Sequence, residues 1–276
     1  MNVLSLFDGI SCGRIALERA GIPVKQYFAS EIDKHAIAVS LCNWRDIVQL
    51  GDVVNVTSES LPTIDLLLAG SPCQGFSSNG KNTGLEHKQS KLFWEFIRLL
   101  RALKPTYFLL ENVSMKQEWR DIISREVGCE PLKINSSLVS AQSRPRLYWT
   151  NIPGVTLPED KGLTIFDILE LPAAPVQPMV TRARKAYCLT ATHGNCLGKD
   201  GLPIPSEIIH NTKRHQRTCI IHNGHWRMLT PVECERLQTV PDNYTACVST
   251  RQRYRCLGNG WTVDVISSLL STALHR

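Results

Sequence analysis

The sequence lacks the features that would place the protein in a membrane or outside the cell. No apolar run approaches the roughly 18–20 residues of a membrane-spanning helix. The first residues, Met1–Ser5, hold no basic segment followed by a hydrophobic one, so no secretory signal is predicted. The ten cysteines include no Cys-x-x-Cys pair, which is typical of reduced thiols and not of a disulfide scaffold. We therefore expect a cytoplasmic protein.

Low-complexity and repeated segments are also missing, and the composition is that of a folded protein. Hydrophobic residues make up 43% and charged residues 20% of the 276 residues, so the chain can bury a core. This length exceeds that of one ordinary domain but is short for two. It predicts one large domain with a smaller lobe.

The net charge of +6 is concentrated in one part of the chain. Residues 1–150 hold 17 Lys and Arg against 15 Asp and Glu, whereas residues 180–255 hold 12 against 5. A basic lobe beside a nearly neutral body is typical of proteins that bind a polyanion such as DNA or RNA. On charge alone, a solvated basic face is an equally good interpretation.

The first 150 residues alternate between strand-like and helix-like segments. Helical spacing predicts helices at 12–20, after Asp33 and around 92–103, and short apolar runs predict strands at 3–7, 27–30, 47–50, 64–69 and 106–110. This repetition indicates an α/β fold with a doubly wound, mostly parallel sheet. In such sheets ligands bind beyond the carboxyl ends of the strands.

The later part of the chain differs in composition and in hydrophobic periodicity. Prolines are frequent and helical periodicity fades from about residue 152 to 226, which predicts a loop-rich lobe. Thr230-Pro231-Val232-Glu233 is a capping box with proline at the first helical position, and residues 263–274 are amphipathic, so helices return. We therefore expect a main domain (1–154), the lobe (155–226) and a C-terminal part that completes the main domain (227–276).

Three strand ends carry residues suited to a nucleoside ligand. The segment Phe7–Gly13 follows the first strand and opens a helix, so its N–H groups can approach an acidic or zwitterionic group. Its glycine spacing is not Gly-x-Gly-x-x-Gly, which disfavours a dinucleotide oxidoreductase. Glu31 is placed to hold ribose hydroxyls, and Asp52 to accept from an adenine amino group. Strand-end acids are often only structural, but the three together favour an adenosine-containing ligand.

Reactive groups follow at the next strand ends. Cys73, in Gly70-Ser71-Pro72-Cys73-Gln74, is a candidate nucleophile if its thiolate is stabilised. Glu111 can act as an acid once buried. Arg144 and Arg146 alternate along an extended segment, which puts them on one side of it. Taken one at a time, Cys73 is most simply interpreted as an inert cysteine, and the two arginines as part of a surface basic strand. The combination of cysteine, carboxylate and arginines at adjacent strand ends is poorly explained by chance.

Six segments then occur in a recognisable order along the chain. They are Phe7–Gly13, Ser71-Pro72-Cys73-Gln74, Glu111-Asn112-Val113, Gln142-x-Arg144-x-Arg146, Arg227-x-Leu229-Thr230-x-x-Glu233-x-x-Arg236-Leu237-Gln238 and Gly258-Asn259-Gly260. In this order they resemble the cytosine-C5 DNA methyltransferase family. Three segments are similar to the eukaryotic de novo branch of this family: Leu4–Ile10, Tyr148–Gly154 and Gly260–Val263. The chain differs from that branch at Asn259, where the branch has arginine. Gln74 after Pro72-Cys73 is as in restriction-type enzymes. The resemblance implies a compact prokaryotic or phage enzyme close to the de novo branch.

The resemblance implies a Rossmann-like fold that binds S-adenosylmethionine, with double-stranded DNA as the partner. The implied cofactor-binding residues are Phe7, Asp8, Gly9, Gly13, Glu31, Ile32, Asp52, Val53, Ser71, Pro72, Asn259, Trp261 and Thr262.

The resemblance also implies a mechanism. The thiolate of Cys73 adds to cytosine C6, Glu111 binds or protonates N3, Arg144 contacts the base O2 and stabilises the thiolate side, and Arg146 supports it. C5 then takes the methyl group and loses its proton, and Cys73 leaves. The cytosine must flip out of the duplex for this chemistry. The loop 75–90 is expected to close over it.

By the same resemblance, the lobe is the target-recognition region. Its Lys and Arg side chains suit phosphates, and its small polar groups suit base edges. The expected DNA contacts are Gln74, Ser77, Arg182, Arg184, Lys185, Thr190, Thr192, Lys213 and Arg214; solvation of a loop is the competing interpretation. Cys219, His222 and His225 form Cys-x-x-His-x-x-His, but a fourth ligand at suitable spacing is missing from the sequence, so no metal is expected.

Two other functions stay open at this point. A catalytically silent DNA- or partner-binding homologue would be marked by loss of the cysteine, and Cys73, Glu111 and Arg144 are all present. A tRNA cytosine-C5 methyltransferase of similar fold would carry a Cys-Phe-Thr signature after the Glu-Asn-Val segment, which this sequence lacks. Monomer and homodimer are both left open.

Overall fold

The chain forms two compact units. The computed structural model describes residues 1–71, 91–170, 176–178, 184–192, 218–222 and 225–272. The first unit comprises Met1–Ile134, Pro145–Leu157 and Ile266–Arg276, and the second comprises Asn135–Arg144 and Pro158–Val265. Residues 227–265, which the sequence assigned to the main domain, fall in the second unit. The division into a main domain, a lobe and a C-terminal part stays a prediction.

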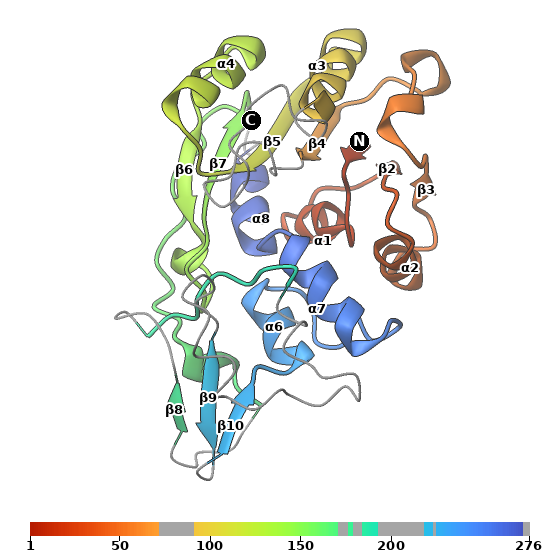
Figure 1. Cartoon of the computed structure of the whole chain (residues 1–276). Helices are drawn as coiled ribbons and strands as arrows, with labels where there is room; N and C mark the ends of the chain where they lie inside the picture. The colour runs from red at the N-terminus through yellow and green to blue at the C-terminus, as the bar shows by residue number, and fades with distance from the viewer. Residues whose placement is uncertain (72–90, 171–175, 179–183, 193–217, 223–224, 273–276) are drawn as a thin grey trace. The chain divides into compact units, whose positions relative to one another are not determined.

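The described strands form two sheets (Figure 1). The strands are β1 (Asn2–Leu6), β2 (Gln26–Ser30), β3 (Val48–Gln49), β4 (Leu66–Gly70), β5 (Tyr107–Val113), β6 (Leu132–Asn135), β7 (Pro145–Thr150), β8 (Val176–Pro178), β9 (Cys219–His222) and β10 (His225–Met228). The larger sheet has the order β3-β2-β1-β4-β5-β7-β6, and the smaller has the order β10-β9-β8. The loop-rich lobe predicted from the sequence therefore contains a small sheet of its own.

The five helices predicted from the sequence are present, and two further helices among the described residues, at 117–127 and 250–259, were not predicted. The helices are α1 (Cys12–Arg19), α2 (Lys34–Asn43), α3 (Lys91–Leu103), α4 (Gln117–Val127), α6 (Pro231–Leu237), α7 (Thr250–Asn259) and α8 (Val263–Ser271), with 3-10 turns η1 (Val53–Asn55), η2 (Ser58–Ser60), η4 (Ser136–Leu138) and η5 (Ile165–Ile168). Asp33 caps α2 by accepting from the His35 N–H, and Thr230 with Glu233 forms the predicted capping box of α6. Among the described helices, none is long and apolar enough to cross a membrane.

The larger sheet is mostly parallel, as predicted. β1 pairs in parallel with both β2 and β4, and β4 pairs in parallel with β5. β7 is antiparallel to β5, with Glu111 opposite Tyr148 and Val113 opposite Arg146. The chain order reverses between β1 and β4, which is the point where open α/β sheets bind ligands beyond their carboxyl strand ends.

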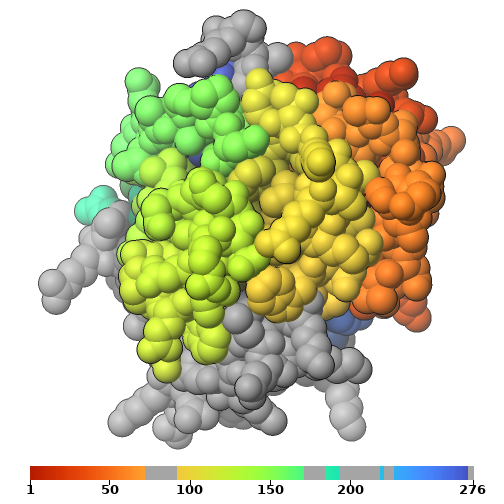
Figure 2. All heavy atoms as spheres, turned by 90° about the horizontal axis from the view of Figure 1, so that it is seen from above, coloured from red at the N-terminus to blue at the C-terminus, as the bar shows by residue number. Residues whose placement is uncertain are grey.

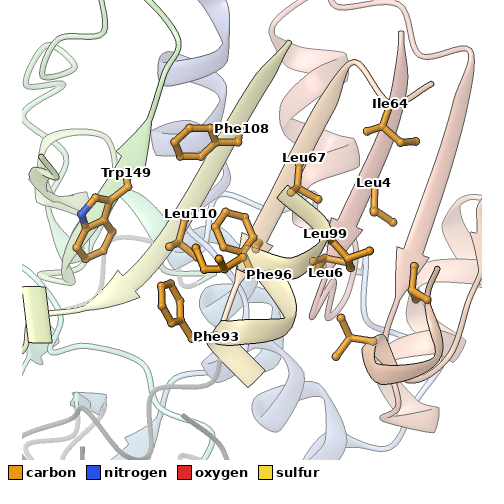
Figure 3. Packing of buried hydrophobic residues seen from close by; sticks show 14 of the residues in the cluster. Leu4, Leu6, Ile64, Leu67, Phe93, Phe96, Leu99, Phe108, Leu110 and Trp149 are labelled. Atoms are coloured by element: carbon orange, nitrogen blue, oxygen red, sulfur yellow. The ribbon is translucent and has the colours of Figure 1, made fainter. Parts of the chain in front are cut away.

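One face of the sheet carries the core of the first unit (Figure 3). Every second residue of β1, β4, β5 and β7 contributes a buried apolar side chain, including Leu4, Leu67, Phe108 and Trp149. These pack against the apolar stripe of α3, where Phe96 meets Phe108 edge-on at 6.3 Å between ring centroids. Figure 2 shows the outer surfaces of α3 and α4 next to each other over this face.

Candidate functional site

The turn between β1 and α1 has an unusual backbone. Phe7, Gly9 and Ser11 all adopt positive φ, at 57°, 60° and 60°. Positive φ is costly for residues with a Cβ, and such conformations cluster at binding sites. At Gly9 an added Cβ would meet nothing within 4 Å, so φ rather than space requires glycine there. Gly13, also expected to line the cofactor, is buried in the first turn of α1.

Glu31, at the end of β2, ties this turn to the next one. Its Oε2 accepts from the Gly9 N–H at 2.8 Å, and its Oε1 accepts from the N–H groups of Ile32 and Asp33, each at 2.8 Å. The carboxylate is thus fixed in position by backbone donors before any ligand arrives. Ile32 beside it is 74% exposed, an unusually open position for a large apolar side chain.

The carboxyl group of Asp8 is directed into the protein. Its oxygens accept from the hydroxyls of Ser11 at 2.5 Å and Tyr27 at 2.7 Å, and the residue is 9% exposed. Burial raises the pKa of Asp8 to about 6, and the hydroxyl donors offset part of that rise. Asp8 was expected to line a cofactor. Its carboxyl group is instead engaged in shaping the turn, which leaves the backbone as the part available to a ligand.

A side chain of α3 holds the turn after β3 in place. Asp52 is exposed and caps η1 by accepting from the Val54 N–H at 3.1 Å, while Val53 is buried. The guanidinium of Arg98 on α3 donates to the carbonyls of Val53 at 3.3 Å and Val56 at 2.9 Å. Arg98 was not predicted from the sequence. α3 also carries Lys91, Glu95 and Arg101, so no pattern distinguishes Arg98 from its other charged residues.

The end of β4 is joined to β5 by a buried hydrogen bond. The Asn112 side-chain N–H donates to Ser71 Oγ at 2.9 Å, and both residues are buried. This bond fixes Ser71 two positions before Cys73. Pro72 and Cys73 themselves lie outside the described residues, as do Gln74, Ser77 and the rest of the loop 75–90.

Glu111 and Arg146 form a buried ion pair across β5 and β7. Arg146 Nε lies 2.9 Å from Glu111 Oε1, and the side chains are only 14% and 11% exposed. In the register of these antiparallel strands the two residues are diagonal neighbours, because Arg146 lies opposite Val113. The pair presents a carboxylate with a fixed orientation at the carboxyl end of β5.

Arg144 is held by backbone carbonyls of the second unit. It precedes β7 and belongs to the second unit, and it is 5% exposed. Its guanidinium donates to the carbonyls of Leu189 at 2.8 Å, Gly260 at 3.0 Å and Gly258 at 3.3 Å. β7 begins at Pro145, so the alternation of an extended strand applies only from that residue on. That Arg144 contacts the base and Arg146 supports it stays a prediction.

The remaining predicted cofactor residues lie in the second unit. Thr262 Oγ1 donates to Gln238 Oε1 at 2.9 Å, Trp261 is 9% exposed, and Asn259 is exposed at the end of α7. Gln142 donates to Gln238 Oε1 at 2.9 Å. Both glutamines stand in the motifs quoted from the sequence, but the sequence analysis gave them no role.

Of the predicted DNA contacts, some side chains are open to solvent and one is not. Arg184, Thr190 and Thr192 are exposed. Lys185 is only 7% exposed, and its ammonium donates to the carbonyls of Ser137 at 2.6 Å and Ser140 at 3.2 Å. Lys185 is therefore a structural residue and not a phosphate contact, because its donors are directed to buried carbonyls. Arg182, Lys213 and Arg214 lie outside the described residues.

The Cys-x-x-His-x-x-His segment forms the hairpin of β9 and β10, with His222 opposite His225. In the part of the chain that the structure describes, no group of three or more His, Cys, Asp or Glu residues is placed to hold a metal ion. The expectation of no metal stays a prediction.

Comparison with known proteins shows which family has these features. The model of the family described as "C-5 cytosine-specific DNA methylase" matches residues 1–121 and 163–275. The type II methyltransferase M.NlaX of Neisseria lactamica is 29% identical over 295 residues, covering 97% of this chain and 94% of that protein. M.HhaI of Haemophilus parahaemolyticus is 27% identical over 308 residues, covering 96% and 92%.

The fold is similar to that of solved methyltransferases. The structure of the methyltransferase EhMeth of Entamoeba histolytica matches with a TM-score of 0.74 at 18% identity, covering 99% of this chain and 97% of that one. The family model spans most of the chain, including the turn after β1 and the strand end that carries Glu111. The chain therefore belongs to the C-5 cytosine-specific DNA methylase family, a family of S-adenosylmethionine-dependent enzymes, and is a DNA cytosine-C5 methyltransferase.

Proposed function

We propose that this protein methylates C5 of a cytosine flipped out of double-stranded DNA, through a covalent bond between Cys73 and C6. The observation that carries this proposal is the buried Glu111–Arg146 pair. It holds a carboxylate at the end of β5, beside the end of β4 that leads to Cys73. A pyrimidine N3 needs a hydrogen-bonding acid nearby when C6 is attacked, and this carboxyl group is suited to that task.

The residues of the first unit fit S-adenosylmethionine. Glu31 offers a fixed carboxylate suited to ribose hydroxyls, and the exposed Ile32 offers an apolar surface suited to a purine. The space beside Gly9 leaves room for a ligand next to the backbone of the turn. Asp52 and Val53 would hold the adenine edge, and Asn259, Trp261 and Thr262 are proposed as further cofactor contacts. When bound, this cofactor supplies the methyl group.

The protein's own groups then carry the following steps. The thiolate of Cys73 forms a bond to C6, and the electron pair of the C5–C6 double bond makes C5 nucleophilic. In its protonated form Glu111 donates a hydrogen bond or its proton to N3, which neutralises the charge that develops on the ring, and the carboxylate left behind is stabilised by the Arg146 guanidinium. Arg146 holds the Glu111 side chain in place. After C5 has been methylated it loses its proton to a base, the C5–C6 double bond re-forms, and the Cys73 thiolate leaves.

The cytosine has to leave the duplex, because C6 and C5 are stacked between neighbouring bases otherwise; extrusion costs a few kcal/mol. We propose Arg184, Thr190 and Thr192 as DNA contacts, since all three are exposed. The proposal extends to Gln74, Ser77, Arg182, Lys213 and Arg214 from the sequence alone. Lysine and arginine contacts to phosphate make affinity fall steeply with salt.

A duplex library with random sequence and 5-fluorocytosine in place of cytosine tests the covalent step. Fluorine replaces the proton that must leave C5, so a covalent protein–DNA adduct should persist with the wild-type chain and S-adenosylmethionine. Cys73→Ser should abolish both the adduct and methylation of an ordinary library, because a serine hydroxyl is much less acidic than a thiol. Glu111→Gln should react slowly. Cys42→Ser removes an exposed thiol on α2 and serves as the matched control that keeps the adduct.

The outcome that contradicts the mechanism is equally specific. If Cys73→Ser methylates cytosine at the wild-type rate, or if the adduct forms through a peptide that does not contain residue 73, the covalent mechanism proposed here is wrong.

A further inference from the structure

The guanidinium of Arg144 is buried among neutral groups. Its described partners are three carbonyls and the Cys188 sulfur, and none of the ion pairs among the described residues includes Arg144. Burying a cation without a carboxylate is costly, so a neutral side chain would serve stability better if only packing were at stake. The planar fork of arginine has one property that lysine lacks: its two Nη atoms donate in different, fixed directions.

Those two directions lead to two different segments of the second unit. Nη1 donates to Leu189 O, at the start of the segment Leu189–Thr192, which we name the recognition segment because the proposed function assigns base contacts to Thr190 and Thr192. Nη2 donates to Gly258 O and Gly260 O, at the start of the segment Gly258–Thr262, which we name the cofactor-wall segment. One side chain thus bonds both segments.

The two segments also touch directly. A Cβ added to Gly258 would lie 2.2 Å from the Thr190 carbonyl carbon and 2.3 Å from the Ala191 nitrogen. Real Cβ atoms do not come so close to backbone atoms, so glycine at 258 lets the Thr190–Ala191 peptide pack on the end of α7 with nothing between them. The backbone that presents Thr190 is therefore seated on the cofactor-wall segment.

A pair of fully buried glutamines repeats the connection. Gln142 Oε1 accepts from the Leu189 N–H at 3.0 Å, and its side-chain N–H donates to Gln238 Oε1 at 2.9 Å. Gln238 in turn donates to Gly260 O at 3.1 Å and accepts from Thr262 Oγ1 at 2.9 Å. Both polar groups of the Leu189 backbone are thus held by side chains two positions apart, Gln142 and Arg144. Arg144 also donates directly to carbonyls of the cofactor-wall segment, and Gln142 is connected to that segment through Gln238.

We propose that Arg144 is a positioning residue that fixes the recognition segment on the cofactor-wall segment, with Gln142 and Gln238 as its partners. This inference rests on the proposed function. A change that loosens the bridge should weaken cofactor binding and sequence discrimination together. Because such a coupling is reciprocal, a cognate duplex should tighten binding of S-adenosylhomocysteine to the wild-type chain and do so less in the variants.

The test compares Arg144→Lys and Gln142→Met with Arg236→Lys in the full chain. Lysine keeps the charge of Arg144 but cannot reach both segments, and methionine keeps the volume of Gln142 without its amide. Arg236 is the matched control because its side-chain hydrogen bonds among the described residues go to Asp242 and the Ile168 carbonyl, which lie in the same unit but in neither segment. Methylation of a random-sequence duplex library, read by sequencing, gives the preferred context. The KM for S-adenosylmethionine, kcat and the melting temperature are measured alongside.

We expect both test variants to raise the KM for S-adenosylmethionine about tenfold and to relax the sequence context, at a temperature well below their melting points. kcat at saturating cofactor should fall less than tenfold, and Arg236→Lys should keep the wild-type KM and context. If Arg144→Lys does not fold, Gln142→Met carries the test. If Arg144→Lys and Gln142→Met lower the melting temperature but leave the KM for S-adenosylmethionine and the preferred sequence context unchanged, this inference is wrong and the proposed function still stands. A wild-type chain that leaves no 5-methylcytosine in the library overturns the proposed function, and this inference with it.

Discussion

Replacing Asp8 by asparagine should change how the stability of the protein depends on pH. The carboxyl group lies in the turn after β1, 9% exposed, between the hydroxyls of Ser11 and Tyr27. Burial raises its pKa from 3.8 to about 6. The folded state therefore holds this proton more tightly than the unfolded chain does. Asparagine has nearly the same shape but no proton to release in this range.

The sign and size of the effect follow from linkage. Below about pH 4 the Asp8 carboxyl is protonated in both states, so it adds no pH dependence. Between about pH 4 and pH 6 the unfolded chain releases the proton and the folded chain keeps it, so stability falls as the pH rises. Above about pH 6 the carboxyl group is ionised in both states, so the free energy of unfolding stays lower by the full amount and changes no further. A pKa difference of about two units corresponds to about 3 kcal/mol.

Urea denaturation at intervals from pH 4 to pH 7.5 measures this directly. The other carboxyl groups titrate in both proteins, so the quantity of interest is the difference in unfolding free energy between Asp8→Asn and wild type. That difference should shift in favour of the variant by about 2.5 kcal/mol across the range, because about 0.5 kcal/mol of the total is already lost at pH 4. A difference that stays constant within about 0.5 kcal/mol would show that Asp8 is not buried as described, and the reasoning would fail.

Three further predictions concern single contacts. Glu235→Gln should lower the free energy of unfolding by about 3 kcal/mol, because it leaves the guanidinium of Arg253 in a buried site without its carboxylate; a loss under about 1 kcal/mol in urea denaturation would contradict this. Thr230→Ala should cost about 1 kcal/mol by removing the cap of α6, whereas Thr230→Ser should restore most of it in the same assay. Arg98→Met should weaken S-adenosylhomocysteine binding about three- to tenfold in calorimetry, because the carbonyls of the turn after β3 lose their donor; the same change at Arg101 on α3 should not.

Most of the fold could be predicted from the sequence because its pattern is strongly periodic. The buried strand β4 is an uninterrupted apolar run, β1 is apolar except for Asn2 and Ser5, and the apolar stripe of α3 recurs at helical spacing. The predicted end of β5 was wrong for a physical reason. The apolar run stops at Leu110, but the strand continues to Val113, because backbone pairing with β7 extends past the last apolar side chain. Hydrophobicity reports burial and not hydrogen-bonded pairing.

The candidate site could be predicted only in part. Residue types at strand ends indicated Glu31 and Glu111, because the topology brings strand ends to one edge of the sheet. Charge, in contrast, does not tell whether a side chain is exposed: Lys185 was expected on DNA and is directed to buried carbonyls. Arg98 was missed because it acts on the backbone of a turn more than forty residues earlier. A contact of this kind leaves no spacing pattern in a single sequence.

The first unit is assembled from three separate stretches of chain, with residues 135–144 and 158–265 lying between them in sequence. During synthesis the ribosome therefore releases nearly all of β1 to β5 long before Ile266 and the residues after it, which complete the same unit. Domains tend to fold as units, and folding in the cell proceeds from the N-terminal side. A nascent chain of about 260 residues lacks Ile266, Leu269 and Leu270, which are buried apolar residues of this unit, so a pause in translation near that point leaves the unit incomplete.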